Sequence, residues 1–148
     1  MNGYQIMDNI KLSNGVEMPP IVETTNWMDY PVMKKLVTAG MQIGFRAFDT
    51  ARDYGNEDIV GRVMKECLKE QGLSRKDIFI TTKIGNSQQA LGNIEEQMDM
   101  SLKNLQTDYI DLWLMHWPYP GHYVDTWHKM EKVYKSGKVR AIGMANYR

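Results

Sequence analysis

The sequence has little cysteine, no excess of charge of either sign and no long apolar segment. Its 148 residues include one cysteine, Cys67, so no disulfide can form within the chain. The 18 basic and 18 acidic residues balance, which argues against nucleic acid or an anionic membrane surface as the main partner. No apolar run approaches the roughly 20 residues that a membrane-spanning helix needs.

The amino-terminal segment lacks the composition of a targeting sequence. Residues 1–15, MNGYQIMDNIKLSNG, contain no basic stretch followed by an apolar core, so we expect no secretory signal peptide. Together with the lone cysteine this predicts a cytoplasmic protein. The length allows one domain with a real core, and no linker or low-complexity segment interrupts it, so we expect a single domain over residues 1–148.

Strand-like and helix-like segments alternate along the chain. A hairpin is expected over residues 10–18, with Asn14 and Gly15 as a two-residue turn. The first helix is expected to begin near Asp29 and to stop at Gly40. Further strands are expected over 20–24, 46–49, 77–83, 109–116 and 139–146, and the four helices over 29–40, 56–71, 94–105 and 127–134. This alternation predicts an α/β fold with a parallel sheet covered by helices.

Polar side chains recur where the expected strands end. Asp49, Lys83, His116 and Asn146 each lie at or just beyond a strand end. Right-handed crossovers place the carboxyl ends of parallel strands along one rim, which is where ligands bind in such folds. Each residue alone also has an ordinary explanation: an aspartate in a turn, a solvated lysine or a hydrogen-bonded core histidine. Four of them at successive strand ends favour a functional site.

Four segments together resemble the aldo-keto reductase family. They are FDTARDYGNEDIVG, IFITTK, SLKNLQTDYIDLWLMHWP and MEKVYKSGKVRAIGMANY, and they occur in the family's order. The resemblance extends from about Val16 to the last residue. It implies reduction of a small aldehyde or ketone with NADPH as the cofactor, and it implies no metal site.

The resemblance also implies a role for each rim residue. The catalytic residues would be Asp49, Tyr54, Lys83 and His116. Tyr54 would donate the proton as general acid, with the ammonium group of Lys83 assisting the donation and Asp49 holding Lys83 in place. His116 would hydrogen-bond the carbonyl oxygen and orient it.

Ligand contacts follow from the same resemblance. The cofactor's nicotinamide end would contact Thr25, Asp49 and Asn146, and the substrate would contact Tyr54, His116 and Trp117. Packing at the barrel rim is an equally good explanation of Trp117. Val22 and Thr24 stand where the family usually has glycines, and Ala145 stands where it usually has serine.

The length of the chain leaves two classes of function open. The family fold is a (β/α)₈ barrel, which typically takes about 250 residues. We therefore expect the amino-terminal portion of such a barrel, with about five βα units after a hairpin, and weak cofactor binding or inactivity in isolation. One class is the reductase described above. The other is a non-catalytic or regulatory barrel fragment that acts through protein contacts, including self-association through unpaired barrel edges.

Overall fold

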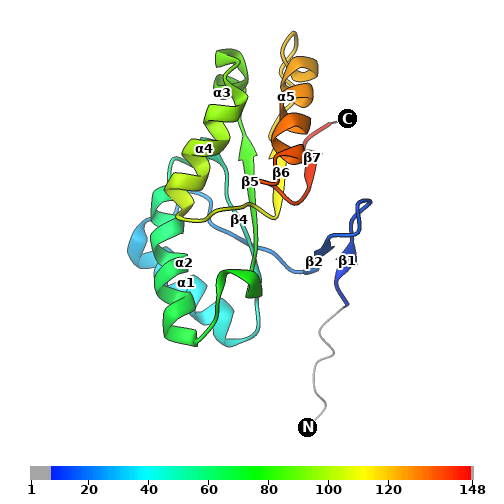
Figure 1. Cartoon of the computed structure of the whole chain (residues 1–148). Helices are drawn as coiled ribbons and strands as arrows, with labels where there is room; N and C mark the ends of the chain where they lie inside the picture. The colour runs from blue at the N-terminus through cyan, green and yellow to red at the C-terminus, as the bar shows by residue number, and fades with distance from the viewer. Residues whose placement is uncertain (1–7, 148) are drawn as a thin grey trace.

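A parallel sheet of five strands organises the chain (Figure 1). The computed structural model describes residues 8–147. Residues 1–7, which belong to the segment for which we expect no signal peptide, and residue 148, the last of the expected domain, lie outside the described residues. The strands are β3 (Glu23–Thr24), β4 (Ala47–Asp49), β5 (Phe79–Ile84), β6 (Leu112–Met115) and β7 (Ile142–Met144). They pair in sequence order, each parallel to the next, as the alternation of segments predicts.

Helices connect the strands and cover the sheet. They are α1 (Tyr30–Gln42), α2 (Glu57–Gln71), α3 (Asn86–Leu91), α4 (Ile94–Leu105) and α5 (Tyr123–Lys135), with short 3₁₀ turns η1 (Arg52–Tyr54) and η2 (Arg75–Asp77). Alternate residues of β6 show which face these helices cover, since successive strand side chains point to opposite faces. Trp113 and Met115 are fully buried, whereas Leu112 and Leu114 are only partly buried. One face of the sheet therefore carries the apolar core.

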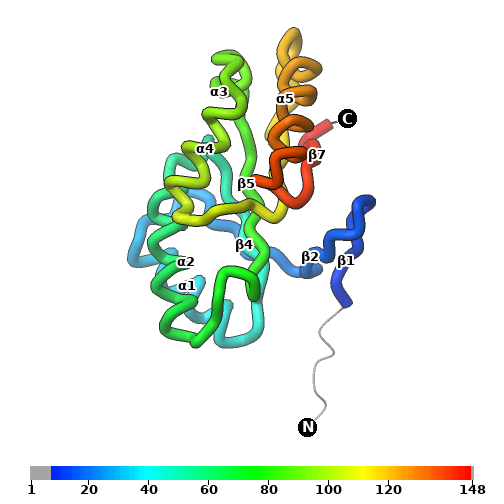
Figure 2. The backbone as a smooth tube through the Cα atoms, viewed as in Figure 1, coloured from blue at the N-terminus to red at the C-terminus, as the bar shows by residue number. Residues whose placement is uncertain are grey.

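The amino-terminal hairpin lies apart from α1 and α2 (Figure 2). It consists of β1 (Ile10–Lys11) and β2 (Glu17–Met18), which pair antiparallel. The predicted two-residue turn is wrong. Leu12 N–H donates to Val16 O at 2.8 Å and Gly15 N–H donates to Leu12 O, so three residues form the loop. Gly15 takes φ +87°, which a three-residue hairpin loop requires of its last residue.

Helix α1 begins as predicted and ends later than predicted. Asp29 caps it, because its Oδ1 accepts the Val32 N–H at 3.1 Å. The helix continues through Gly40 to Gln42. A Cβ at Gly40 would collide with the side-chain carboxylate of Glu23 on β3, so this glycine allows the close packing of α1 on the sheet. Burial of that carboxylate raises the pKa of Glu23.

Two buried carboxylates join the strands to their surroundings. Glu57, at the start of α2, accepts hydrogen bonds from Thr82 at 2.7 Å and from Ser101 at 3.1 Å. Asp111, just before β6, accepts from Arg75 and Arg140, both at 2.7 Å. Buried charges of this kind are tolerated because they are fully hydrogen-bonded.

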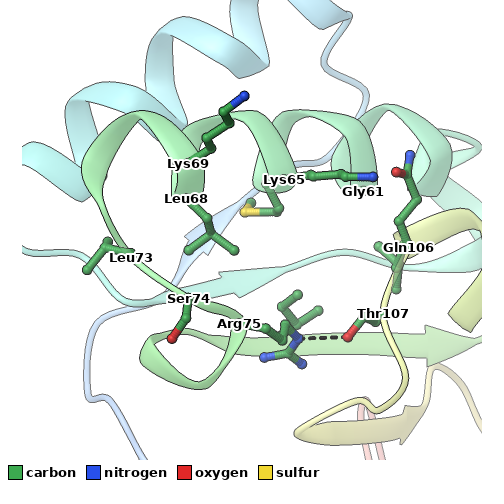
Figure 3. A pocket seen from close by; sticks show the side chains of 12 residues that line it. Gly61, Lys65, Leu68, Lys69, Leu73, Ser74, Arg75, Gln106 and Thr107 are labelled. Atoms are coloured by element: carbon green, nitrogen blue, oxygen red, sulfur yellow. Dashed lines mark hydrogen bonds between the residues drawn. The ribbon is translucent and has the colours of Figure 1, made fainter.

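Helices α2 and α4 cross closely beside a surface pocket lined by both (Figure 3). Gly61 faces the end of α4, and a Cβ on it would lie 2.7 Å from the Leu105 Cα. The atoms it would meet belong to the backbone, so a helix would have to move. The guanidinium group of Arg75, which also lines the pocket, donates to Thr107 Oγ1 at 2.9 Å.

We expect Gly61→Ala to destabilise the fold although alanine is the better helix former. Helix propensity alone would favour alanine by about 1 kcal/mol, whereas overpacking a close contact costs about 1–3 kcal/mol. Urea unfolding monitored by tryptophan fluorescence measures the balance. Lys65→Ala, on the same helix, is the control and should stay within about 0.5 kcal/mol of the parent. A Gly61→Ala protein more stable than the parent would show that α2 and α4 do not cross so closely.

The described helices give no sign of a membrane span. None of them is long and apolar enough to cross a bilayer. The cytoplasmic location stays a prediction from the sequence.

Candidate active site

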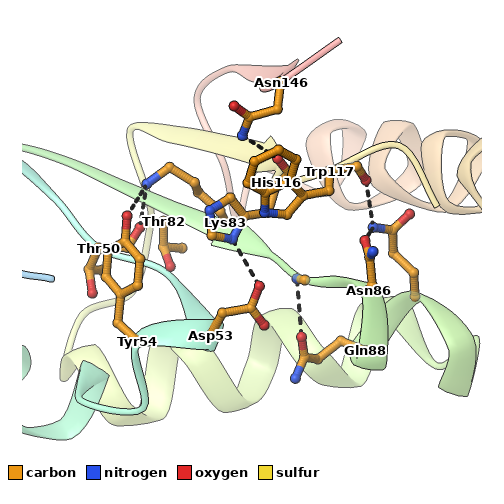
Figure 4. Close-up of polar contacts among 12 residues, drawn as sticks. Thr50, Asp53, Tyr54, Thr82, Lys83, Asn86, Gln88, His116, Trp117 and Asn146 are labelled. Atoms are coloured by element: carbon orange, nitrogen blue, oxygen red, sulfur yellow. Dashed lines mark hydrogen bonds and ion pairs between the residues drawn. The ribbon is translucent and has the colours of Figure 1, made fainter. Parts of the chain in front are cut away.

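Three ionisable side chains gather at the carboxyl end of the sheet, and Figure 4 shows two of them, Lys83 and His116. Asp49 is the last residue of β4, Lys83 is the last but one of β5, and His116 directly follows β6. The parallel register aligns these strand ends, since β4 pairs with β5 and β5 pairs with β6. Residues far apart in the sequence thus face one another, as the strand-end pattern predicts.

Lys83 connects a carboxylate to a phenol. Its Nζ lies 2.6 Å from both carboxylate oxygens of Asp49 and donates to the main-chain oxygen of Thr50 at 3.0 Å. The Tyr54 hydroxyl lies 3.4 Å from the same nitrogen. The lysine is 8% exposed, so its charge is held by these partners and not by bulk water. This places a fixed positive charge beside the Tyr54 oxygen.

The turn η1 brings Tyr54 to this position. Its N–H donates to Ala51 O at 3.1 Å, and Gly55, which follows, adopts φ +66° so that the chain can turn into α2. Asn56 then anchors the turn to the β3–α1 connection, because its side chain donates to Thr25 O at 2.8 Å. Thr50 N–H donates to Thr81 O at 2.9 Å before the turn, so the phenol is carried by a short segment tied at both ends.

His116 has a carboxylate partner that the sequence analysis missed. Its Nδ1 lies 2.9 Å from Asp53 Oδ2, and its main-chain oxygen accepts from Asn146 Nδ2 at 2.8 Å. The imidazole lies edge-on to the Tyr54 ring at 5.9 Å and stacks on the Trp117 ring at 5.7 Å. The sequence does place an acidic residue, Asp53, next to Tyr54, but the direction in which the Asp53 side chain points depends on the turn η1.

Helix α3, which no prediction covered, lies beside Trp117. The buried Gln89 donates from Nε2 to the Trp117 main-chain oxygen at 3.1 Å. This fixes the backbone after His116 while about half of the indole surface stays exposed. An apolar wall for a substrate stays a prediction for Trp117.

Thr25 and Asn146 differ in how they meet the site. Thr25 is buried, and its Oγ1 donates to the Asp49 main-chain oxygen at 3.0 Å, so it supports the end of β4. Asn146 is exposed, two residues beyond β7, with φ +61°. A ligand at this rim would meet the Asn146 amide directly and Thr25 through Asp49.

The described residues contain no group of three or more His, Cys, Asp or Glu side chains that could hold a metal ion. The chemistry available at the rim is that of a phenol, an ammonium group, two carboxylates and an imidazole. Such a set can transfer a proton and stabilise a developing negative charge on oxygen.

The sequence matches the family model described as the aldo/keto reductase family over residues 18–148. A glyoxal reductase of Bacillus subtilis is 41% identical over 150 residues, which cover 96% of this chain and 50% of that protein. A methylglyoxal reductase, DkgA, of Escherichia coli O157:H7 is 38% identical over 140 residues, covering 93% of this chain and 49% of that protein. The chain thus spans about half the length of the curated relatives it matches.

Solved structures of barrels in this family have the same fold over the matched part. The aldose reductase of Schistosoma japonicum superposes with a TM-score of 0.88 at 31% identity, over 96% of this chain and 54% of that one. A Bombyx mori aldo-keto reductase in complex with NADP gives 0.85 at 29% identity, over 94% and 50%. The five strands and their helices therefore correspond to part of a (β/α)₈ barrel, as predicted.

Proposed function

The chain belongs to the aldo/keto reductase family, and on that premise we propose that its rim site reduces a small aldehyde or ketone to an alcohol with NADPH. The observation that carries the proposal is the position of Lys83 Nζ, between the Asp49 carboxylate and the Tyr54 hydroxyl. This arrangement prepares a phenol to give up its proton. It is supported by relatives whose names state that they reduce carbonyl compounds.

Each residue has one task in the reaction. When bound, the cofactor would supply a hydride to the carbonyl carbon and leave as NADP⁺. The carbonyl oxygen takes the Tyr54 proton as the C–O double bond becomes single, and Tyr54 is left as a phenolate that the Lys83 charge stabilises. Asp49 holds Lys83 through both of its oxygens. His116 hydrogen-bonds the carbonyl oxygen, and water later returns a proton to Tyr54.

The rim fits the nicotinamide end of such a cofactor. A carboxamide needs both a donor and an acceptor, and the exposed Asn146 side chain offers an amide whose Nδ2 is fixed by His116 O. Asp49 keeps part of its carboxylate exposed while it holds Lys83. Thr25 would act by fixing the main chain of Asp49.

The test is an assay of NADPH-dependent reduction of methylglyoxal, in which the loss of NADPH absorbance measures the rate. We expect Lys83→Met to lower kcat by about 10²- to 10³-fold, the loss typical when one electrostatic donor is removed from a site. Lys65→Met, on the outer face of α2, is the matched control and should leave the rate unchanged. Equal kcat values for the parent and Lys83→Met would refute the assignment.

A non-catalytic role through protein contacts is the second candidate, and the outer edge of β7 favours it. Within residues 8–147, β3 and β7 are the edges of the parallel sheet. A groove of about 610 Å³ lies over β6 and β7 and reaches Met144 near the edge; it is also lined by residues of α5 and of the hairpin loop. Unpaired strand edges with apolar neighbours promote pairing with another chain. We therefore propose that copies of this chain self-associate through β7.

Met144→Lys is expected to shift the protein toward the monomer, because a charge on an edge strand opposes pairing. Met144 is 48% exposed on β7, and Met100, on α4, is 47% exposed, so Met100→Lys is a matched control. Light scattering at micromolar concentration measures the mass of each protein, and Met100→Lys should match the parent whereas Met144→Lys should be smaller. A parent chain that is already a stable monomer would contradict this prediction.

A further inference from the structure

We propose that Asp53 is a positioning residue that fixes a hydrogen on Nδ1 of His116 and so makes His116 a donor to the substrate only as an imidazolium ion. The inference rests on the proposed function, in which His116 hydrogen-bonds the carbonyl oxygen. It starts from the 2.9 Å contact between Asp53 Oδ2 and His116 Nδ1. The histidine side chain is 12% exposed and the aspartate 36%, so a largely buried ring meets a carboxylate at the rim.

Counting hydrogens gives the protonation state. An ionised carboxylate has only acceptor oxygens, so the ring nitrogen that it contacts must carry the hydrogen. A neutral His116 then has its hydrogen on Nδ1, and its Nε2 presents a lone pair that would repel a carbonyl oxygen. Donation from Nε2 requires a second ring hydrogen, and Asp53 supplies the counter-charge for that state.

The other groups around His116 do not offer Nδ1 a competing hydrogen. The Tyr54 ring is nearly perpendicular to the imidazole, and Trp117 stacks on the imidazole. Asn146 donates to the main-chain oxygen of His116 and not to the ring. The remaining ionisable neighbour, Lys83, is directed at Asp49, Thr50 and Tyr54. Among the residues that the structure describes, Asp53 supplies the carboxylate that contacts the imidazole ring (Figure 4).

Gly85 provides the space for the Asp53 carboxylate. Its backbone, with φ −87° and ψ 178°, is one that any residue can adopt, so no turn requires glycine there. A Cβ at Gly85 would instead overlap the carboxyl group of Asp53. Gly85→Ala should therefore push the carboxylate away from His116 while every charge of the site is kept. This gives a second perturbation, independent of any change to Asp53.

The tautomer of His116 is measured by ¹⁵N NMR on the 148-residue chain labelled at histidine. We expect the neutral ring to carry its hydrogen on Nδ1 in the parent chain. In Asp53→Leu and in Gly85→Ala the hydrogen should move largely to Nε2, because the acceptor is gone or displaced. Glu131→Leu is the control: Glu131 lies 3.5 Å from the exposed His128, and its loss should leave His116 unchanged.

A parent chain with the hydrogen of neutral His116 on Nε2, or a tautomer that neither variant alters, would overturn the proposal. The measurement needs no turnover, so a chain without reductase activity would count against the proposed function and not against Asp53. In active protein, the parent and Asp53→Leu should differ in how the rate depends on pH, because a neutral His116 can donate from Nε2 only when Asp53 is absent. Identical pH profiles would overturn the link to donation.

Discussion

Replacing Tyr54 with phenylalanine is expected to lower kcat by about 10²- to 10⁴-fold, the contribution typical of a general acid. The substitution removes one oxygen and keeps the ring that lies against His116. Because the phenol gives up its proton only in the transition state, the loss should appear in kcat and leave cofactor affinity nearly unchanged. Steady-state kinetics with methylglyoxal and quenching of tryptophan fluorescence by NADPH measure the two quantities.

Tyr30→Phe is the matched control for this experiment. Its hydroxyl also has a charged partner, Glu66 at 2.6 Å, but the pair lies between α1 and α2, away from the rim. Tyr30→Phe should therefore alter stability slightly and turnover hardly at all. A Tyr54→Phe enzyme with the kcat of the parent would exclude Tyr54 as the proton donor.

The sequence predicted part of the site because it showed where the strands end. The apolar runs before Asp49 and His116 end at the edge of the sheet, and parallel pairing makes these ends neighbours whatever the details of packing. This needs only local patterns and one topological rule. The same rule could not give the 3.4 Å approach of Lys83 to Tyr54, which depends on the turn η1.

The features that the sequence analysis missed depend on tertiary packing. Helix α3 lies in GNSQQALG, which is short and polar and has no apolar period for a helix. Gly40 was interpreted as a helix stop because glycine is usual there, but the structure uses it for close approach to Glu23. The contact of Asp53 with His116 depends on the same kind of space, left here by Gly85.

Asp111→Ala is expected to lower the free energy of unfolding by about 3 kcal/mol, the lower end of the cost of breaking a buried ion pair. The Asp111 side chain is fully buried, and it accepts from Arg75, Arg140 and the main-chain N–H of Ile80. Removing it leaves that N–H without its partner and two guanidinium groups without their counter-charge. The two guanidinium groups are partly exposed, so hydration by water offsets some of the lost stability.

The comparison variants separate charge from hydrogen bonding. Asp111→Asn keeps an acceptor for Ile80 N–H and should cost less than Asp111→Ala. Asp99→Asn removes an exposed carboxylate that pairs with Lys138, and it should change stability by less than about 1 kcal/mol. Urea unfolding of the three variants measures these differences. Equal stabilities for Asp111→Ala and Asp99→Asn would show that Asp111 does not hold the strands.

We expect the loss of the Asp111 carboxylate to affect the rim site through the pairing of β5 with β6. Asp111 N–H and its carboxylate both bond to Ile80, which fixes β6 against β5 at the strand ends opposite the rim. The same register pairs Lys83 with Leu114, two residues before His116. If Asp111 sets this register, Asp111→Ala should weaken the His116–Asp53 contact even under conditions where the protein stays folded, and the ¹⁵N spectrum of His116 would report it. An unchanged His116 signal in a folded Asp111→Ala protein would confine the role of Asp111 to stability.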